Sequence, residues 1–87
     1  MRAVPSNAFR HKVRRLPGKL QAAVAERLRF FMQNPQHPLL HDHALTGKRV
    51  GQRSINVTGD WRIVYEPIEP DITLLVDVDT HHNLYGT

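Results

Sequence analysis

The sequence predicts an α+β fold in which two N-terminal helices pack on an antiparallel sheet of three to four strands. Apolar residues recur at helical spacing through the first 34 residues, and from about residue 50 onward they alternate with polar ones. No internal repeat or low-complexity tract divides the chain, so residues 1–87 are expected to form a single domain. A domain of this length buries only about 60–65% of the surface that its unfolded chain exposes, so its core should be thin.

The first third of the chain predicts a helical hairpin. Before it, residues 2–4 can form a short edge strand. Ser6 is a good N-cap for a helix over residues 6–16. One stripe of that helix is apolar, at Phe9, Val13 and Leu16. A second helix spans residues 17–34, and because only Pro17-Gly18 breaks the pattern between the two, they should lie antiparallel.

The rest of the chain predicts a loop followed by a meander of strands. Residues 35–48 have no helical or strand period and are expected to form a loop. Strands are expected at about 50–57, 61–66 and 71–79, where apolar and polar residues alternate. The last of these is apolar on both faces in its middle, which is typical of a central strand. The helices would then cover one face of the sheet and leave the other face open.

The hairpin over residues 53–65 carries polar side chains that a core strand pair does not need. Thr58-Gly59-Asp60 predicts its turn, since glycine accepts backbone angles that other residues avoid and aspartate caps turns. A carboxylate, the only tryptophan and two arginines lie close together here: Asp60, Trp61, Arg53 and Arg62. This mixture indicates a functional surface.

Composition narrows the class of protein. The formal net charge is +4 and the pI is about 10.1, from twelve Lys and Arg against eight acids, which favours a polyanionic or acidic partner. The chain has no cysteine, so it can form neither a disulfide nor a thiolate site, and a reducing cytoplasm is expected. No apolar run is long enough for a signal peptide or a membrane span, so no membrane partner is expected.

Cleavage of RNA through its 2′-hydroxyl needs a base, an acid and a cation that stabilises the charged phosphorane, and the sequence holds candidates for each. Histidine suits either proton role because its unperturbed pKa is about 6.5. The candidates for proton transfer are His41, His43, His81, His82 and Asp60. The candidates for phosphate contacts are Lys48, Arg49, Arg53 and Arg62, and those for stacking on bases are Trp61 and Tyr85.

Each candidate also has a structural interpretation. Loop histidines can be merely solvated, Asp60 can cap its turn, Trp61 can belong to the core and Tyr85 can anchor the tail. The two close histidine pairs could instead bind a metal ion, but neither has the paired spacing that is typical of zinc sites. No metal site is therefore expected.

Four pieces of the chain point to a family. In order they are Asp42-His43-Ala-Leu-Thr-Gly47, Gly51-Gln-Arg53, Val57-x-x-Asp60-Trp61 with Ile63-Val64-Tyr65, and Thr80-His81-His82-Asn-Leu84-Tyr85-Gly86. They resemble the bacterial RelE/ParE superfamily of toxin–antitoxin toxins, and most of all its YafQ-type mRNA interferases. The helical half matches in pattern, so the resemblance covers nearly the whole chain.

The resemblance implies a metal-independent endonuclease that needs no cofactor. It would cut mRNA in the ribosomal A site, in the cytoplasm, and be restrained by a cognate antitoxin protein. Carried over by position, the catalytic candidates are His43, Asp60, Arg62, His81 and Tyr85. The RNA-binding candidates are Lys48, Arg49, Arg53, Asn56 and Trp61. Within these sets the resemblance assigns proton transfer to His43 and His81, and phosphate stabilisation to Arg62.

One departure from the family pattern lies inside the hairpin. YafQ-type toxins have a further active-site histidine where this chain has Asn56, and an amide cannot take up a proton at working pH. Either His43 and His81 carry out both proton transfers, or cleavage is weak. Two alternatives stay open. One is a ParE-like toxin that inhibits DNA gyrase, which has the same fold and does not need the set of histidines and Asp60. The other, which Asn56 suggests, is a non-catalytic protein that binds RNA or antitoxin.

Overall fold

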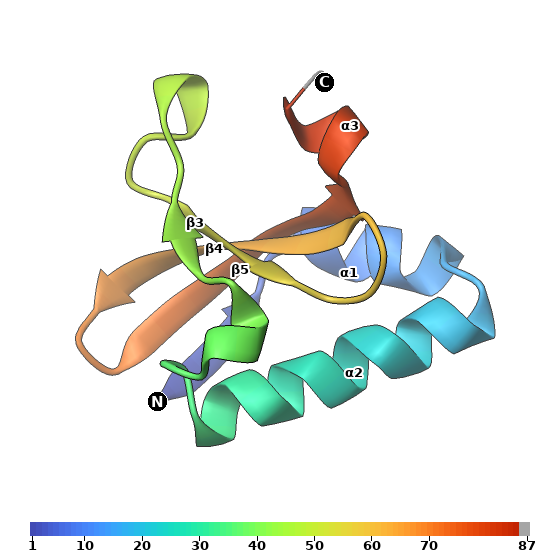
Figure 1. Cartoon of the computed structure of the whole chain (residues 1–87), viewed down its shortest axis with the longest axis horizontal. Coiled ribbons are helices and arrows are strands. Elements are labelled where there is room, and N and C mark those ends of the chain that lie inside the picture. The colour runs from blue at the N-terminus through green and yellow to red at the C-terminus, as the bar shows by residue number, and fades with distance from the viewer. Residues whose placement is uncertain (86–87) are drawn as a thin grey trace.

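Within residues 1–85, which the computed structural model describes, a five-stranded sheet carries α1 and α2 on one side and α3 on the other (Figure 1). The strands are β1 (Arg2–Pro5), β2 (His43–Ala44), β3 (Arg53–Asn56), β4 (Trp61–Glu69) and β5 (Ile72–Thr80), in the order β1-β5-β4-β3-β2. The α-helices are α1 (Asn7–Arg15), α2 (Gly18–Gln33) and α3 (His81–Tyr85). The short 3₁₀ helices η1 (Pro38–Leu40) and η2 (Gly47–Arg49) lie between α2 and β3.

The predicted layers are confirmed, but the sheet has more strands than predicted and is mixed. The β3-β4-β5 meander is antiparallel, and β5 is an interior strand as expected. The additional strand is β2, which lies in the segment predicted as a loop and is too short to show an alternating pattern. The pairing of β1 with β5 is parallel, with Arg2 opposite Ile72. Sequence periodicity does not show whether two strands that are so far apart in the chain pair in the parallel or the antiparallel direction.

Local signals set both ends of α1. The Ser6 hydroxyl accepts a hydrogen bond from the Phe9 N–H at 3.1 Å, so Ser6 is the N-cap that the sequence predicts. The same hydroxyl donates to the Val76 carbonyl at 3.1 Å, which ties the start of α1 to β5. The chain is extended at Leu16 and Pro17, and α2 begins directly after them. The N-cap therefore fixes α1 on the sheet as well as starting the helix.

The core lies between the α1–α2 layer and one face of the sheet. Its buried members are Phe9, Val24, Phe31, Leu40, Ile55, Val57, Ile63, Tyr65, Leu75 and Val78. On β4, Ile63 and Tyr65 face the helices, and Trp61 packs against the same cluster. The opposite face was expected to be open, yet Ser54 and Val64 on it are fully buried. The η2 segment and α3 stand on that side of the sheet (Figure 1).

Candidate functional site

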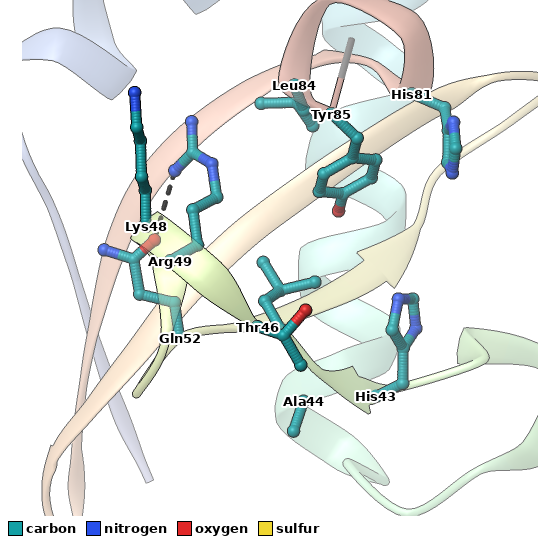
Figure 2. Close-up of a pocket in the computed structure, with 10 residues that line it drawn as sticks. His43, Ala44, Thr46, Lys48, Arg49, Gln52, His81, Leu84 and Tyr85 are labelled. Atoms are coloured by element: carbon teal, nitrogen blue, oxygen red, sulfur yellow. Dashed lines mark hydrogen bonds between the residues drawn. The ribbon is translucent and has the colours of Figure 1, made fainter. Parts of the chain in front are cut away.

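A hollow of about 730 Å³ lies on the face of the sheet that carries η2 and α3 (Figure 2). Its lining comes from β2 and the segment after it, and from α3. The lining residues are His43, Ala44, Leu45, Thr46, Lys48, Arg49, Gln52, His81, Leu84 and Tyr85. It therefore brings together His43, His81 and Tyr85 from the catalytic prediction and Lys48 and Arg49 from the RNA-binding prediction.

His43 is the histidine of the edge strand β2. Its Nδ1 lies 2.9 Å from the backbone carbonyl oxygen of His41. A carbonyl oxygen only accepts, so Nδ1 must carry the proton and donate it. In the neutral ring Nε2 then keeps a free lone pair, which is the arrangement that a general base requires. His41 itself has a left-handed backbone, with φ of 48°.

His81 and Tyr85 are the first and last residues of α3 and contact each other. Their ring centroids are 4.6 Å apart at an interplanar angle of 72°, an edge-to-face arrangement. The His81 N–H donates to the carbonyl of Asp60 at 2.8 Å, so the β3–β4 turn holds the start of α3. The Tyr85 hydroxyl is buried and has no hydrogen-bond partner among residues 1–85. Figure 2 shows this hydroxyl directed into the hollow, where it can donate to a bound group.

The two cations of the hollow differ in how they are held. The Lys48 side chain is exposed at the rim. Arg49 donates to the Gln52 amide oxygen at 3.1 Å, the dashed line in Figure 2, and to the Asp77 carboxylate at 3.2 Å. Arg49 is therefore fixed on the sheet, whereas Lys48 is available to a ligand.

A polar cluster extends from Arg49 along β5, and we call Lys12, Arg49, Asp77, Asp79 and Asn83 the β5 network. Lys12 reaches from α1 to the Asp77 carboxylate at 2.7 Å and to the Asp79 carboxylate at 2.9 Å. Burial alone would raise the pKa of Asp79, but hydrogen bonds from Asn83, Lys12 and the Thr80 N–H outweigh it and lower that pKa. The network therefore joins α1, η2 and α3 across one strand.

The hairpin residues that were predicted as site residues lie outside the hollow. Asp60 is exposed and reaches the site only through its backbone bond to His81. Arg62 donates to the backbone carbonyls of Gly59 and Trp61, at 2.8 and 3.0 Å. Asn56 lies opposite Arg62 in the β3–β4 ladder, and Trp61 packs on the core.

Arg53 lies in a second hollow of about 510 Å³, which Asp42 and Tyr65 also line. Its Nε donates to the Asp42 carboxylate at 2.8 Å, and that ion pair raises the pKa of Arg53. The structure thus separates Arg53 from His43, although the two residues belong to strands that pair.

Several residues of the hollow and of the β5 network were not predicted as site residues from the sequence. Thr46, Gln52 and Leu84 line the hollow, and each lies in one of the pieces that carry the family resemblance, although none was predicted as a site residue. Asp77 and Asp79 could have been found, because they are charged residues at alternating positions of an apolar strand, where a buried partner is required. Within the described residues no three His, Asp or Glu side chains group as a metal ion would need. None of the helices in residues 1–85 is long and apolar enough to cross a membrane.

The fold is that of the RelE-like toxins. YafQ from E. coli strain BL21(DE3) superposes with a TM-score of 0.80 at 20% identity, over 99% of this chain and 100% of that chain. The YoeB/ParE toxin from Agrobacterium tumefaciens gives 0.74 at 18% identity, over 93% and 99% of the two chains. A chain of the E. coli DinJ-YafQ complex gives 0.70 at 22% identity, over 99% and 100%.

The sequence itself assigns the family. Residues 4–85 match the model of the ParE toxin of type II toxin-antitoxin systems, parDE. The chain therefore belongs to this toxin family, within the RelE/ParE superfamily. No sequence among curated proteins matches it.

Proposed function

We propose that this toxin is an mRNA endonuclease that acts on the ribosome through acid–base chemistry. The observation that carries the proposal is the hollow that holds His43, His81 and Tyr85 beside Lys48 and Arg49. His43 Nε2 removes the proton of a 2′-hydroxyl, whose oxygen attacks the neighbouring phosphorus. His81 protonates the departing 5′-oxygen, so the products carry a 2′,3′-cyclic phosphate and a 5′-hydroxyl.

The remaining predicted residues support the reacting phosphate and the RNA strand. Lys48 and the Tyr85 hydroxyl offset the charge of the phosphorane, and Arg49, which Asp77 holds on the sheet, adds positive charge beside them without leaving that ion pair. Beyond the hollow, Asp60, Trp61 and Arg62 form the hairpin surface beside His81, where the strand would leave the site. Asn56 adds an amide to that surface, which can form hydrogen bonds but cannot transfer a proton. Arg53 is left out of the proposed RNA contacts because Asp42 already engages it.

Cleavage of mRNA on programmed ribosomes tests the proposal. His43→Gln and His81→Gln should each lower the cleavage rate by about 10²–10⁴, the usual contribution of a general acid or base. His11→Gln is the matched control, since His11 is an exposed histidine of α1 outside the hollow. A substrate with a 2′-deoxy nucleotide at the cleavage position should resist cleavage, and EDTA should have no effect. Cleavage at wild-type rates in both site variants would sink the mechanism.

A second candidate follows from the family description, which is that of the ParE toxins. Inhibition of DNA gyrase would use the same fold with a different surface. A supercoiling assay with purified gyrase separates the two candidates. Inhibition that persists in His43→Gln, together with intact mRNA on ribosomes, would replace the nuclease proposal with this one.

The proposed partner is a cognate antitoxin, and the proposed location is the cytoplasm. The neighbours include the DinJ-YafQ toxin-antitoxin complex. Charge gives a physical reason: residues 1–41 hold eight Lys and Arg with Glu26 as the only acid, whereas residues 42–87 hold four against seven. The basic helices therefore suit an acidic segment that folds on binding. Co-purification with the product of the neighbouring gene, lost at high salt, is the expected result, and no association at low salt would contradict it.

A further inference from the structure

The turn His41–His43 passes between the two hollows. In an extended chain successive side chains point to opposite faces. Asp42 accordingly lines the second hollow, on the side of α2, whereas His43 lines the first. The position of one side chain is therefore coupled to that of the next.

The Asp42 carboxylate is held from two directions. One oxygen accepts from Arg53 Nε at 2.8 Å, and the other accepts a hydrogen bond from the Tyr65 hydroxyl. Tyr65 is itself fixed, because its side chain is buried and its ring packs on Phe31 with the centroids 4.9 Å apart. Burial and the Asp42 carboxylate both raise the pKa of the Tyr65 hydroxyl, so it stays protonated and donates. We call Asp42, Arg53 and Tyr65 the Asp42 anchor.

The strand that carries His43 is short, and the buried side chains that flank it are Leu40 before the turn and Leu45 after it. β2 is two residues long and lies at the edge of the sheet, paired only with β3. One further backbone bond, from the Leu45 N–H to Gln52, follows it. Short edge segments of this kind open locally at low cost in free energy. Between these two buried residues, the Asp42 side chain ties the turn to β3 and β4 through Arg53 and Tyr65.

The anchor also bears on the tautomer of His43. The His43 Nδ1 donates to the carbonyl of His41, and that carbonyl points correctly only while His41 keeps its left-handed backbone. Asp42 lies between these two residues. Fixing its carboxylate fixes both the carbonyl that accepts and the ring that donates.

We propose that Asp42 is a positioning residue for His43. Held by Arg53 and Tyr65 on the far side of the sheet edge, it orders the turn so that the His43 proton lies on Nδ1 and Nε2 is free toward the hollow. This deepens the function proposed above and rests on it only for the catalytic consequence. The structural claim concerns a tautomer, which can be measured whether or not the protein cleaves RNA.

Long-range ¹H–¹⁵N correlation spectra of the ¹⁵N-labelled full chain at pH 8, where imidazoles are neutral, test the claim. Wild-type His43 should show the Nδ1–H tautomer. Asp42→Ala should shift it toward a mixture with Nε2–H, and Tyr65→Phe, which removes one hydrogen bond but keeps the ring, should shift it less. In a ribosome cleavage assay Asp42→Ala should lower kcat about 10²-fold with little change in KM, as expected for a misplaced base.

Two controls separate positioning from general stability. Glu26→Ala breaks the exposed ion pair with Arg29, and Val24→Ala weakens the core of α2; neither residue lines the hollow in which Asp42, Arg53 and Tyr65 meet. Both variants should keep the Nδ1–H tautomer. A folded Asp42→Ala protein with an unchanged His43 tautomer would overturn the inference. A wild-type protein that shows the tautomer but cleaves no mRNA would instead overturn the proposed function alone.

Discussion

Removal of the Lys12 ammonium group should destabilise the protein through the β5 network. Lys12→Met keeps most of the aliphatic stem and leaves Asp77 and Asp79 without their shared cation. The side chain of Lys12 is 42% exposed, so each pair counts as a largely solvated ion pair that contributes at most about 1 kcal/mol. Asp77 keeps Arg49, and Asp79 keeps only neutral donors. We expect a total loss of about 1 kcal/mol at pH 7, which lowers Tm by about 4–8 °C in a domain of this size.

The pH dependence of the stability loss shows whether the missing charge of Lys12 causes it. The lowered pKa of Asp79 contributes stability that is present above its unfolded pKa of about 3.9 and is lost as the pH falls through the folded pKa. Burial alone would lower the pKa of Lys12, but the hydrogen bonds to Asp77 and Asp79 outweigh it and raise that pKa. The stability that Lys12 contributes is therefore fully present below its unfolded pKa of about 10.4 and is lost as the pH rises through the folded pKa. The difference in Tm between wild type and variant should therefore be largest between about pH 4 and 10.

Thermal unfolding followed by circular dichroism from pH 3 to pH 9 measures this difference. Arg29→Met is the matched control, because its ion pair with Glu26 is formed by side chains that are 64% and 74% exposed and should contribute less than about 0.5 kcal/mol. A Lys12→Met protein as stable as wild type at pH 7 would refute the reasoning. So would a loss of stability that is as large at pH 3 as at pH 7, since that loss would come from stem packing.

Three further predictions concern the loop between α2 and β3. Leu40→Ala, at a fully buried position, should lower the free energy of unfolding in urea by about 2–5 kcal/mol, and a loss under 1 kcal/mol would contradict its place in the core. At His41, where φ is 48°, His41→Gly should be tolerated whereas His41→Val should lose about 1–2 kcal/mol more in the same experiment; equal stabilities would refute the left-handed backbone. Lys48→Ala should reduce the salt dependence of single-stranded RNA affinity by about 0.7 in the log–log slope, measured by fluorescence anisotropy, and an unchanged slope would remove Lys48 from the RNA surface.

Local pattern was enough to predict most of the elements. The helical stripe of α1, its cap at Ser6 and the alternation along the β3–β4 hairpin are each decided by neighbours in sequence, and the structure confirms them. The parallel β1–β5 pairing and the strand β2 were not predicted. The first joins distant segments, and the second is shorter than any period that could mark it.

In the candidate site, too, the residues that sequence could supply differ from the contacts that only packing decides. The resemblance to a family supplied His43, His81 and Tyr85, and the structure brings these three residues into one hollow. Arg53 was predicted to act with them, because the pattern of its strand does not show which charged partner it meets on the neighbouring segment. The contact of Arg53 with Asp42, and the cations that Asp77 holds, depend on packing across the sheet edge and across β5. No spacing rule along the chain describes either contact.

The parallel pairing of β1 with β5 also sets the order in which the protein can assemble. β1 is synthesised first, yet the strand beside it is the last strand in the described chain. Contacts between such distant segments raise the contact order and slow folding, because the intervening chain must be closed into a loop before they form. His81 and Tyr85 follow β5 directly, and the hollow needs both. A nascent chain therefore cannot assemble this hollow until synthesis has passed α3.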